Sequence, residues 1–218
     1  MIIGVLKEVL SNENRVSISP DIVVKLIKLG YSIQVEKDAG LKSNFTNSQY
    51  MEVGATIIDS PEEIWQSSDI ILKVNGPSES SPDETVCLTG DKTLISFFGP
   101  AQHLNKLKLM ARDNVNLLAM DSVPRLSRAQ KMDALSSMAN VAGSRAVIEA
   151  SHKFGRFFGG QITAAGKIPP AKVLVIGAGV AGLSAIGTAN NLGAIVRAFD
   201  TRMEVKEEVE SLHAEFLM

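Results

Sequence analysis

The chain has 218 residues, enough for one large domain or two smaller ones with buried cores. Its net charge of −2 excludes the strong basic field that nucleic acids and anionic membrane surfaces attract. Cys87 is the single cysteine, which excludes a disulfide within the chain and is typical of a reducing compartment. No apolar window reaches the length of a membrane-spanning helix, so we expect a chain of cytosolic character without direct membrane insertion.

Strand and helix patterns alternate through the first 120 residues. Short apolar runs rich in β-branched residues predict strands at 2–6, 31–36, 55–58, 69–74, 93–97 and 115–120. Amphipathic segments predict helices at 20–29, at 48–53, from 60 onward and at 101–112. The stretch 75–91 is polar and rich in Ser, Pro and Gly, which predicts a loop. This alternation is typical of a parallel sheet with helices on both faces.

The pattern becomes helical after residue 127 and returns to alternation near residue 170. We expect a long helix within 127–158, a turn at 163–170, strands at 172–176, 194–199 and 214–218, and helices up to 192 and at 203–212. The predicted fold class is α/β, with two doubly wound parallel-sheet (Rossmann-like) domains, the second truncated. The predicted segments are an N-terminal α/β domain at 1–135, a linking helix at 136–165 and the first part of a Rossmann domain at 166–218.

A glycine pattern follows the predicted strand 172–176. Gly177 allows a tight turn, Gly179 lets the backbone approach a pyrophosphate, and Gly182 lets the helix pack closely on the strand. The start of that helix presents N–H groups and a partial positive charge to the phosphates. Asp200 ends the next strand, where a carboxylate accepts hydrogen bonds from ribose hydroxyls and repels a 2′-phosphate. The segment therefore predicts a site for NAD rather than NADP.

A second group of polar residues lies between the predicted strand 115–120 and the helix that follows. Arg125 can donate a fork of hydrogen bonds, Gln130 can donate and accept, and Asp133 accepts. That set suits a carboxamide and ribose hydroxyls, which present both donors and acceptors. Polar residues at a helix start also serve as caps and solvated charges, so the residues alone leave both interpretations open.

Several segments resemble a known family. PRLSRAQKMDALSSMANVAG, QITAAGKIPPAKVLVIGAGVAGL and AFDTR are similar to the NAD(H)-binding domain of proton-translocating NAD(P) transhydrogenase, α subunit, and the similarity runs essentially end to end. The resemblance implies that Arg125, Gln130 and Asp133 hold NAD(H) against NADP(H) on another domain, with Gln130 bridging the two nucleotides. It implies that the remaining cofactor contacts are Leu126, Ser127, Ser136, Gly177, Gly179, Val180, Gly182, Asp200, Thr201 and Arg202.

The resemblance also implies the reaction and the partners. Hydride would pass directly between NAD(H) and NADP(H), without a protein nucleophile or a metal, and would be coupled to proton translocation by membrane domains that this chain lacks. The implied partners are the remainder of the α subunit, the membrane and NADP(H)-binding β subunit, and a second copy of this domain. The implied location is peripheral, on the cytoplasmic side of the inner membrane.

Two alternatives remain open. Alanine dehydrogenase shares the fold, and Arg15 and Lys73 match its pyruvate-binding residues. That enzyme, however, has a catalytic histidine just after the strand corresponding to 93–97, whereas His103 comes later here, on a predicted helix. The second alternative is a non-catalytic remnant of a split gene, since Gly99 and Ser144 depart from the family pattern.

Overall fold

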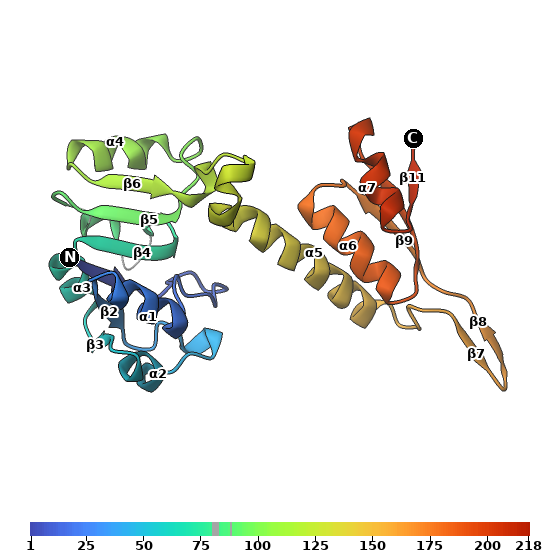
Figure 1. Ribbon diagram of the computed structural model, residues 1–218, viewed down its shortest axis with the longest axis horizontal. Coiled ribbons are helices and arrows are strands. Elements are labelled where there is room, and N and C mark those ends of the chain that lie inside the picture. The colour runs from blue at the N-terminus through green and yellow to red at the C-terminus, as the bar shows by residue number, and fades with distance from the viewer. Residues whose placement is uncertain (80–82, 88) are drawn as a thin grey trace. The chain divides into compact units, whose positions relative to one another are not determined.

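The computed structural model describes residues 1–79, 83–87 and 89–218, so part of the predicted loop 75–91 (residues 80–82 and 88) lies outside the described residues. The chain forms two compact units, Met1–Met132 and Asp133–Met218. Each unit contains its own parallel sheet (Figure 1).

Unit 1 contains a six-stranded sheet in the order β3-β2-β1-β4-β5-β6, and every neighbouring pair is parallel. Its strands are β1 (Ile2–Val5), β2 (Ser32–Glu36), β3 (Thr56–Ile58), β4 (Ile70–Asn75), β5 (Thr93–Phe97) and β6 (Asn116–Ala119). Its α-helices are α1 (Pro20–Lys28), α2 (Asn47–Glu52), α3 (Pro61–Ser67) and α4 (Leu104–Arg112). Short 3-10 turns occupy η1 (Leu41–Ser43), η2 (Thr85–Cys87), η3 (Met120–Ser122) and η4 (Ser127–Met132). This strand order is that of a doubly wound fold, and the predicted fold class is confirmed.

Two apolar cores lie against this sheet. One includes Val5, Val23 and Tyr50, and the other includes Leu6 and Trp65. Successive side chains of a strand point to opposite faces, so β1 and the residue after it supply both cores. Helices therefore cover both faces of the sheet, as a doubly wound arrangement requires.

Left-handed glycines end three of the predicted helices. Gly30, Gly54 and Gly193 have φ of +91°, +95° and +82°, and each is followed after one residue by a strand, β2, β3 and β10 respectively. Residues with a Cβ are strained at such angles, so glycine is favoured where the chain leaves a helix and turns into the next strand.

Helix α4 is shorter than the sequence predicts, since it begins at Leu104 rather than at residue 101. Gly99 has φ of +63°, and its carbonyl accepts hydrogen bonds from the N–H groups of Gln102 (2.9 Å) and His103 (3.1 Å). These bonds form a turn after β5 that uses the residues expected in the first helical turn. His103 becomes the cap residue before the helix.

Unit 2 contains a three-stranded parallel sheet in the order β11-β10-β9 and a separate antiparallel hairpin of β7 and β8. Its strands are β7 (Gln161–Thr163), β8 (Gly166–Ile168), β9 (Lys172–Ile176), β10 (Ile195–Phe199) and β11 (Glu215–Leu217). Its helices are α5 (Ala134–Lys153), α6 (Val180–Asn191), α7 (Lys206–Ser211) and the 3-10 turn η5 (Met203–Val205).

The interval 136–165, which the sequence assigns to a linking helix, contains most of α5 and then the strand β7. The helix ends at Lys153, and the chain turns through Gly155, whose φ is +76°. Gly159 and Gly160 follow, and a run with three glycines does not sustain a helix. The hairpin β7-β8 spans residues 161–168, so it overlaps both the end of this interval and the turn predicted at 163–170.

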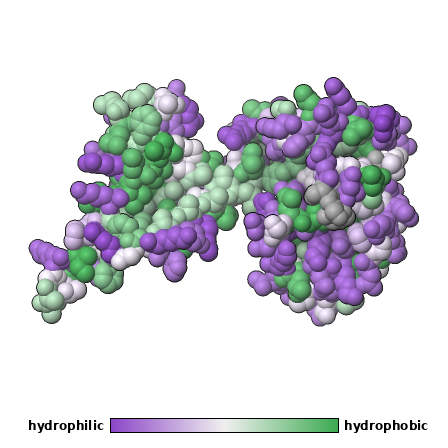
Figure 2. All heavy atoms as spheres, turned by 180° about the vertical axis from the view of Figure 1, so that it is seen from behind, coloured by the Kyte–Doolittle hydropathy of each residue, from purple (hydrophilic) through white to green (hydrophobic). Residues whose placement is uncertain are grey.

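One face of the unit 2 sheet is covered and the other is exposed. Alternate residues of β10 are buried, and Val196 and Ala198 pack in one core with Ile186 of α6 and Val209 of α7. The opposite face carries exposed apolar side chains, namely Leu174, Ile176, Ile195 and Phe199. Apolar surface over this unit is visible in Figure 2. Within the described residues, none of the helices combines the length and the apolar character needed to span a bilayer.

Tyr50→Phe tests the packing of unit 1. The Tyr50 hydroxyl is buried and donates to the Ile18 carbonyl oxygen (2.7 Å), and burial raises the pKa of Tyr50 to about 12. Removing the donor leaves a buried carbonyl without this partner and should lower the free energy of unfolding by about 1–3 kcal/mol. Urea unfolding followed by Trp65 fluorescence measures the change, because the single Trp is buried in unit 1.

The matched control is Tyr31→Phe, at a partly exposed tyrosine of the same unit. It should change the free energy of unfolding by no more than about 0.5 kcal/mol. Equal losses in the two variants would contradict the role given to the Tyr50 hydrogen bond.

Candidate functional site

The glycine turn connects β9 to α6 as the sequence predicts. Gly177 has φ of +98°, and its N–H donates to the Phe199 carbonyl oxygen of β10 (2.8 Å). A Cβ on Gly182 would overlap the Gly177 carbonyl oxygen, so only glycine allows the helix to approach the strand this closely. Gly179 is the cap residue of α6. Because a Cβ on Gly179 would meet no atom of the chain within 4 Å, the space in front of its backbone is open.

This open space faces the start of α6. The first N–H groups of a helix lack partners within the helix, and the macrodipole adds a partial positive charge at that end. Val180, the first residue of α6, is 39% exposed, so the turn is accessible to a solute. An anion such as a pyrophosphate fits this combination of free backbone approach, N–H donors and positive potential.

Asp200 is hydrogen-bonded to the glycine turn itself. One carboxylate oxygen, Oδ2, accepts from the N–H of Ala178 (2.7 Å), and the other, Oδ1, accepts from the N–H of Arg202 (2.8 Å). The Arg202 guanidinium also contacts both oxygens at 3.2 and 3.3 Å. The carboxylate thus holds the end of β10 against the turn after β9.

These contacts fix the charge of Asp200. The guanidinium of Arg202, followed by the two backbone N–H groups, holds the pKa of the Asp200 carboxyl well below its usual range. The Asp200 side chain is 8% exposed, whereas that of Arg202 is 57% exposed. Arg202 can therefore move toward solvent or toward a bound anion, while Asp200 stays in place.

The start of α5 contains two more of the predicted residues. Asp133 caps the helix: its Oδ1 accepts from the N–H of Ser136 (2.9 Å), and its Oδ2 accepts from the Ser136 hydroxyl (2.6 Å). Asp133 is thus a helix cap, which is one of the two interpretations that the sequence pattern leaves open. Both side chains are partly exposed, so they also remain accessible to a ligand.

The Arg125 segment belongs to unit 1. Residues 123–126 are not helical and lead into η4, where Ala129 is buried. Arg125, Ser127 and Gln130 are exposed, and Leu126 is 48% exposed. Solvent-exposed polar side chains on a short, irregular segment are available to a ligand, and such segments often carry function.

The predicted residues are therefore divided between the two units. Unit 2 brings together the glycines, Val180, Asp200, Thr201 and Arg202 at one turn, and it also contains Asp133 and Ser136. Unit 1 contains Arg125, Leu126, Ser127 and Gln130 on one continuous segment.

Two contacts near these segments have no sequence signal. Asp121 accepts hydrogen bonds from the N–H groups of Phe98 (2.8 Å) and Gly99 (2.9 Å), so it connects the segment after β6 to the end of β5. Ala178 contributes only its N–H to Asp200. Any residue has that group, and its partner is decided by the tertiary fold.

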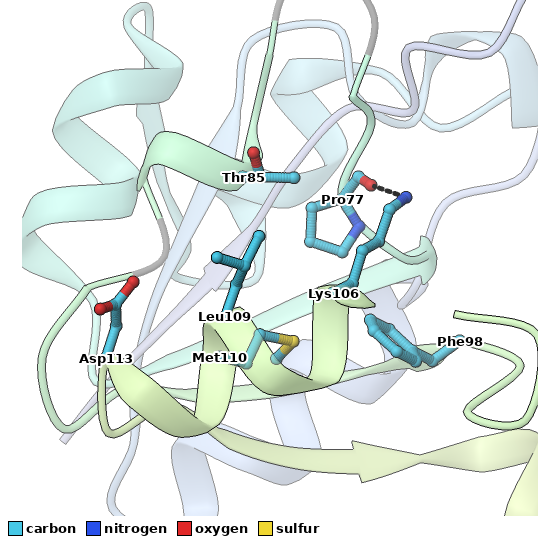
Figure 3. A pocket seen from close by; sticks show the side chains of 7 residues that line it. All are labelled: Pro77, Thr85, Phe98, Lys106, Leu109, Met110 and Asp113. Atoms are coloured by element: carbon cyan, nitrogen blue, oxygen red, sulfur yellow. Dashed lines mark hydrogen bonds between the residues drawn. The ribbon is translucent and has the colours of Figure 1, made fainter. Parts of the chain in front are cut away.

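A small cavity in unit 1 is distinct from this site. It has a volume of about 20 Å³ and is lined by Pro77, Thr85, Phe98, Lys106, Leu109, Met110 and Asp113 (Figure 3). The Lys106 ammonium at its rim donates to the Pro77 carbonyl oxygen (3.1 Å). Ligand pockets measure about 300–1,000 Å³, so this cavity holds no more than a water molecule.

The two residues that match the pyruvate-binding residues of alanine dehydrogenase, Lys73 and Arg15, each form an ion pair within the chain. Lys73 is 3% exposed, and its ammonium forms an ion pair with Glu84 (2.7 Å). Arg15 forms an ion pair with Glu13 (2.7 Å), and this guanidinium contributes most to lowering the pKa of Glu13 to about 2. Neither cation points unpaired into an open site.

Arg202→Gln tests the electrostatics of the turn. A carbon-13 NMR titration should place the pKa of the Asp200 carboxyl below the usual aspartate value of about 3.9. The substitution should raise this pKa. Because the folded-state pKa lies below the unfolded value, the ionised carboxylate stabilises unit 2 at neutral pH. This contribution is lost as the pH falls from about 4 through the folded-state pKa.

Arg197→Gln is the control, because Arg197 is paired with Glu215 of the neighbouring strand rather than with Asp200. It should leave the Asp200 midpoint unchanged. An Asp200 midpoint that does not respond to Arg202→Gln would show that the guanidinium does not control this carboxylate.

Comparison with known proteins identifies the family of these two units. The family described as Alanine dehydrogenase/PNT, N-terminal domain, matches residues 4–142, and its C-terminal domain matches residues 146–218. The NAD(P) transhydrogenase subunit alpha of Haemophilus influenzae is 57% identical over 217 residues, which are 100% of this chain and 41% of the relative. The alanine dehydrogenase of Staphylococcus saprophyticus is 32% identical over 215 residues, 97% of this chain and 56% of the relative.

A solved structure gives the same result. The transhydrogenase from Sinorhizobium meliloti superposes with a TM-score of 0.93 at 40% identity, covering 100% of this chain and 64% of that one. The chain thus spans about two fifths to two thirds of the length of these relatives. The resemblance to the transhydrogenase α subunit is confirmed. The chain belongs to the alanine dehydrogenase/PNT family.

Proposed function

We propose that this chain is part of the NAD(H)-binding component of a proton-translocating transhydrogenase. In that reaction, hydride passes directly between NAD(H) on this component and NADP(H) on a partner domain. The relatives named as transhydrogenase α subunit support the proposal, with identity up to 57% over this chain. The open glycine turn supports it independently, because the turn has the features of a dinucleotide site.

The observation that carries the proposal is the geometry of Gly177, Gly179 and Gly182 at the start of α6. Two of these glycines are required by the backbone, through a positive φ at Gly177 and a close approach at Gly182. Neither requirement applies to Gly179, which has φ of −81° and open space in front of it. A glycine that the chain itself does not need is explained by a ligand that approaches its backbone.

Asp200 and Arg202 give the site its preference for NAD(H) over NADP(H). A ribose hydroxyl can donate to the carboxylate, whose negative charge is maintained at every physiological pH. A 2′-phosphate would meet that negative charge, so NAD(H) is favoured over NADP(H). Arg202 is exposed, and its guanidinium becomes available to the adenosine ribose or a phosphate once it leaves Asp200. Thr201 lies between the two residues and is exposed.

The other proposed contacts hold the nicotinamide half. Arg125, Gln130 and Asp133 position the NAD(H) nicotinamide and its ribose against NADP(H), and Gln130 bridges the two nucleotides. Ser136 lies beside Asp133, and both are accessible at the start of α5. Leu126, Ser127 and the Val180 backbone complete the contact set. Bound NADH supplies the hydride, and the catalytic contribution of the chain is alignment, which is worth several orders of magnitude in rate.

The proposed partners are the remainder of an α subunit, a membrane and NADP(H)-binding β subunit, and a second copy of this domain. Together they would place the chain on the cytoplasmic side of the inner membrane. The exposed face of the unit 2 sheet supports the first partner. Leu174 and Ile176 are 57% and 78% exposed there, and doubly wound sheets have helices on both faces.

Alanine dehydrogenase activity is less well supported by the site. Lys73 would have to leave a buried ion pair with Glu84 to reach a pyruvate carbonyl. His103 lies at the start of α4, where it is exposed and contacts the Phe98 ring edge to face. A non-catalytic remnant is the other alternative, and it is distinguished by NADH binding and hydride transfer.

Gly179→Val tests the cofactor site without disturbing the fold. A Cβ at residue 179 meets no atom of the folded chain within 4 Å, so the melting temperature should fall by no more than about a few degrees, the effect of a less favourable cap residue. The valine side chain would occupy the approach of the pyrophosphate, and NADH affinity in calorimetric titration should fall about tenfold or more. NADPH should bind more weakly than NADH to the unsubstituted chain. Unchanged NADH affinity in Gly179→Val would refute the assigned site.

Gln130→Ala tests the transfer step. In a complex with an NADP(H)-binding component, the substitution should slow hydride transfer from NADH by about tenfold or more, while NADH affinity changes much less. Stopped-flow absorbance measures the transfer and calorimetry measures the affinity. Equal losses in both would contradict the bridging role. NADH oxidation driven by pyruvate and ammonia, and abolished by Lys73→Ala, would instead establish the alanine dehydrogenase alternative.

A further inference from the structure

Helices α5 and α6 meet at a glycine that sequence patterns do not single out. Gly143 is buried in the middle of α5. A Cβ at this position would overlap the Ala181 carbonyl oxygen and would lie 2.8 Å from the Ala181 carbonyl carbon. Both are backbone atoms, which cannot rotate away as a flexible side chain can. The spacing of these two helices is therefore available only to glycine at this position.

Hydroxyl groups beside Gly143 fix how the two helices are aligned. The hydroxyl oxygens of Ser144 and Ser184 lie 2.8 Å apart, and that of Thr188 lies 3.0 Å from Ser144. Ser184 also donates to the Asn140 carbonyl oxygen of α5 (2.7 Å). Sliding one helix along the other would break these bonds, and the two that involve Ser144 are partly buried, so they oppose a change of register.

The helices run in the same direction, and α5 extends farther at its start. Figure 1 shows α5 and α6 side by side, and the chain after α5 returns to the end of α6, where a Cβ on Gly159 would lie 2.7 Å from the Leu192 carbonyl oxygen. Residues 134–142 of α5 precede Gly143, whereas only Val180 precedes Ala181 in α6. At about 1.5 Å per residue, the start of α5 extends roughly 10 Å past the start of α6.

This overhang places Asp133 and Ser136 beyond the N-terminus of α6, on the side where its N–H groups point. The contact at Ala181 lies in the first turn of α6, which follows directly from Gly179. A change in helix spacing at Gly143 is thus transmitted to the distance between the start of α5 and the glycine turn, because both helices are stiff over these lengths.

We propose that Gly143 is a positioning residue for the cofactor: its contact with Ala181 sets the distance between the glycine turn and the Asp133–Ser136 pair. A dinucleotide that binds the turn through its pyrophosphate then meets that pair with its nicotinamide half. The role rests on the proposed NAD(H) site and concerns the spacing within it. It distinguishes ligands by length, because ADP occupies only the turn and NADH extends to both groups.

Gly143→Ala tests this role, and Gly187→Ala is the matched control. A Cβ on Gly187 of α6 would be 3.9 Å from Leu212, an ordinary contact. Calorimetric titration of the 218-residue chain should show that Gly143→Ala weakens NADH binding about tenfold or more and leaves ADP binding unchanged within error. Gly187→Ala should change neither affinity. Circular dichroism melting confirms that each variant is folded.

The outcomes separate the spacing role from the cofactor site. Unchanged NADH affinity in Gly143→Ala would overturn the positioning role. Equal losses of NADH and ADP affinity would overturn it too, because they would show damage to the turn itself. An unsubstituted chain that binds neither nucleotide would refute the proposed function and this role with it.

A second variant covers the case in which Gly143→Ala does not fold. Ser144→Ala combined with Thr188→Val removes the Ser144 contacts with Ser184 and Thr188 without adding volume at the glycine, and it leaves the Ser184 bond to the Asn140 carbonyl oxygen in place. It should weaken NADH binding measurably while ADP binding is retained. NADH affinity equal to that of the unsubstituted chain would overturn the role.

Discussion

Close contact of backbone on backbone, permitted by glycine, is the constraint on which unit 2 depends. Gly182 brings α6 against the Gly177 carbonyl, and Gly143 brings α5 against the Ala181 carbonyl. Three elements, namely α5, α6 and the turn after β9, therefore converge at the first turn of α6 through backbone contacts. A side chain at Gly182 would push α6 away from the turn after β9, and one at Gly143 would push α5 away from α6. A site built for alignment does not tolerate such displacements.

Electrostatics act on the same turn. Asp200 uses its carboxylate to hold the N–H of Ala178, and Arg202 keeps that carboxylate ionised. The residue predicted to recognise ribose thus also fastens the end of β10 to the loop that faces the pyrophosphate. Structural support and recognition share one side chain, and the exposed guanidinium of Arg202 is the group that is free to rearrange when a ligand binds.

The sequence predicts the parts of the fold that depend on local pattern. The run from Lys172 to Ile176, the glycines after it and the strand that ends before Asp200 are found at nearly the predicted positions. Their signals are short-range: apolar alternation, positive-φ glycines and helix caps. The hairpin β7-β8 and the late start of α4 were not predicted, because tight turns around Gly155 and Gly99 override helical composition.

Contacts between distant segments could not be predicted from one sequence. No local pattern in the amino-acid sequence indicates that the Ala178 N–H donates to Asp200 or that Gly143 faces Ala181, since these contacts form only when the sheet and helices assemble. A polar pattern and a family resemblance indicate the site residues of unit 1, and their role in binding stays a proposal.

A crystal structure of this chain with NADH, completed by the remainder of an α subunit, tests the central claim most directly. We expect electron density for the pyrophosphate beside Gly179, for the adenosine ribose beside Asp200, and for the nicotinamide near the segment that begins at Arg125. A structure at saturating NADH in which these three places hold no nucleotide would contradict the account.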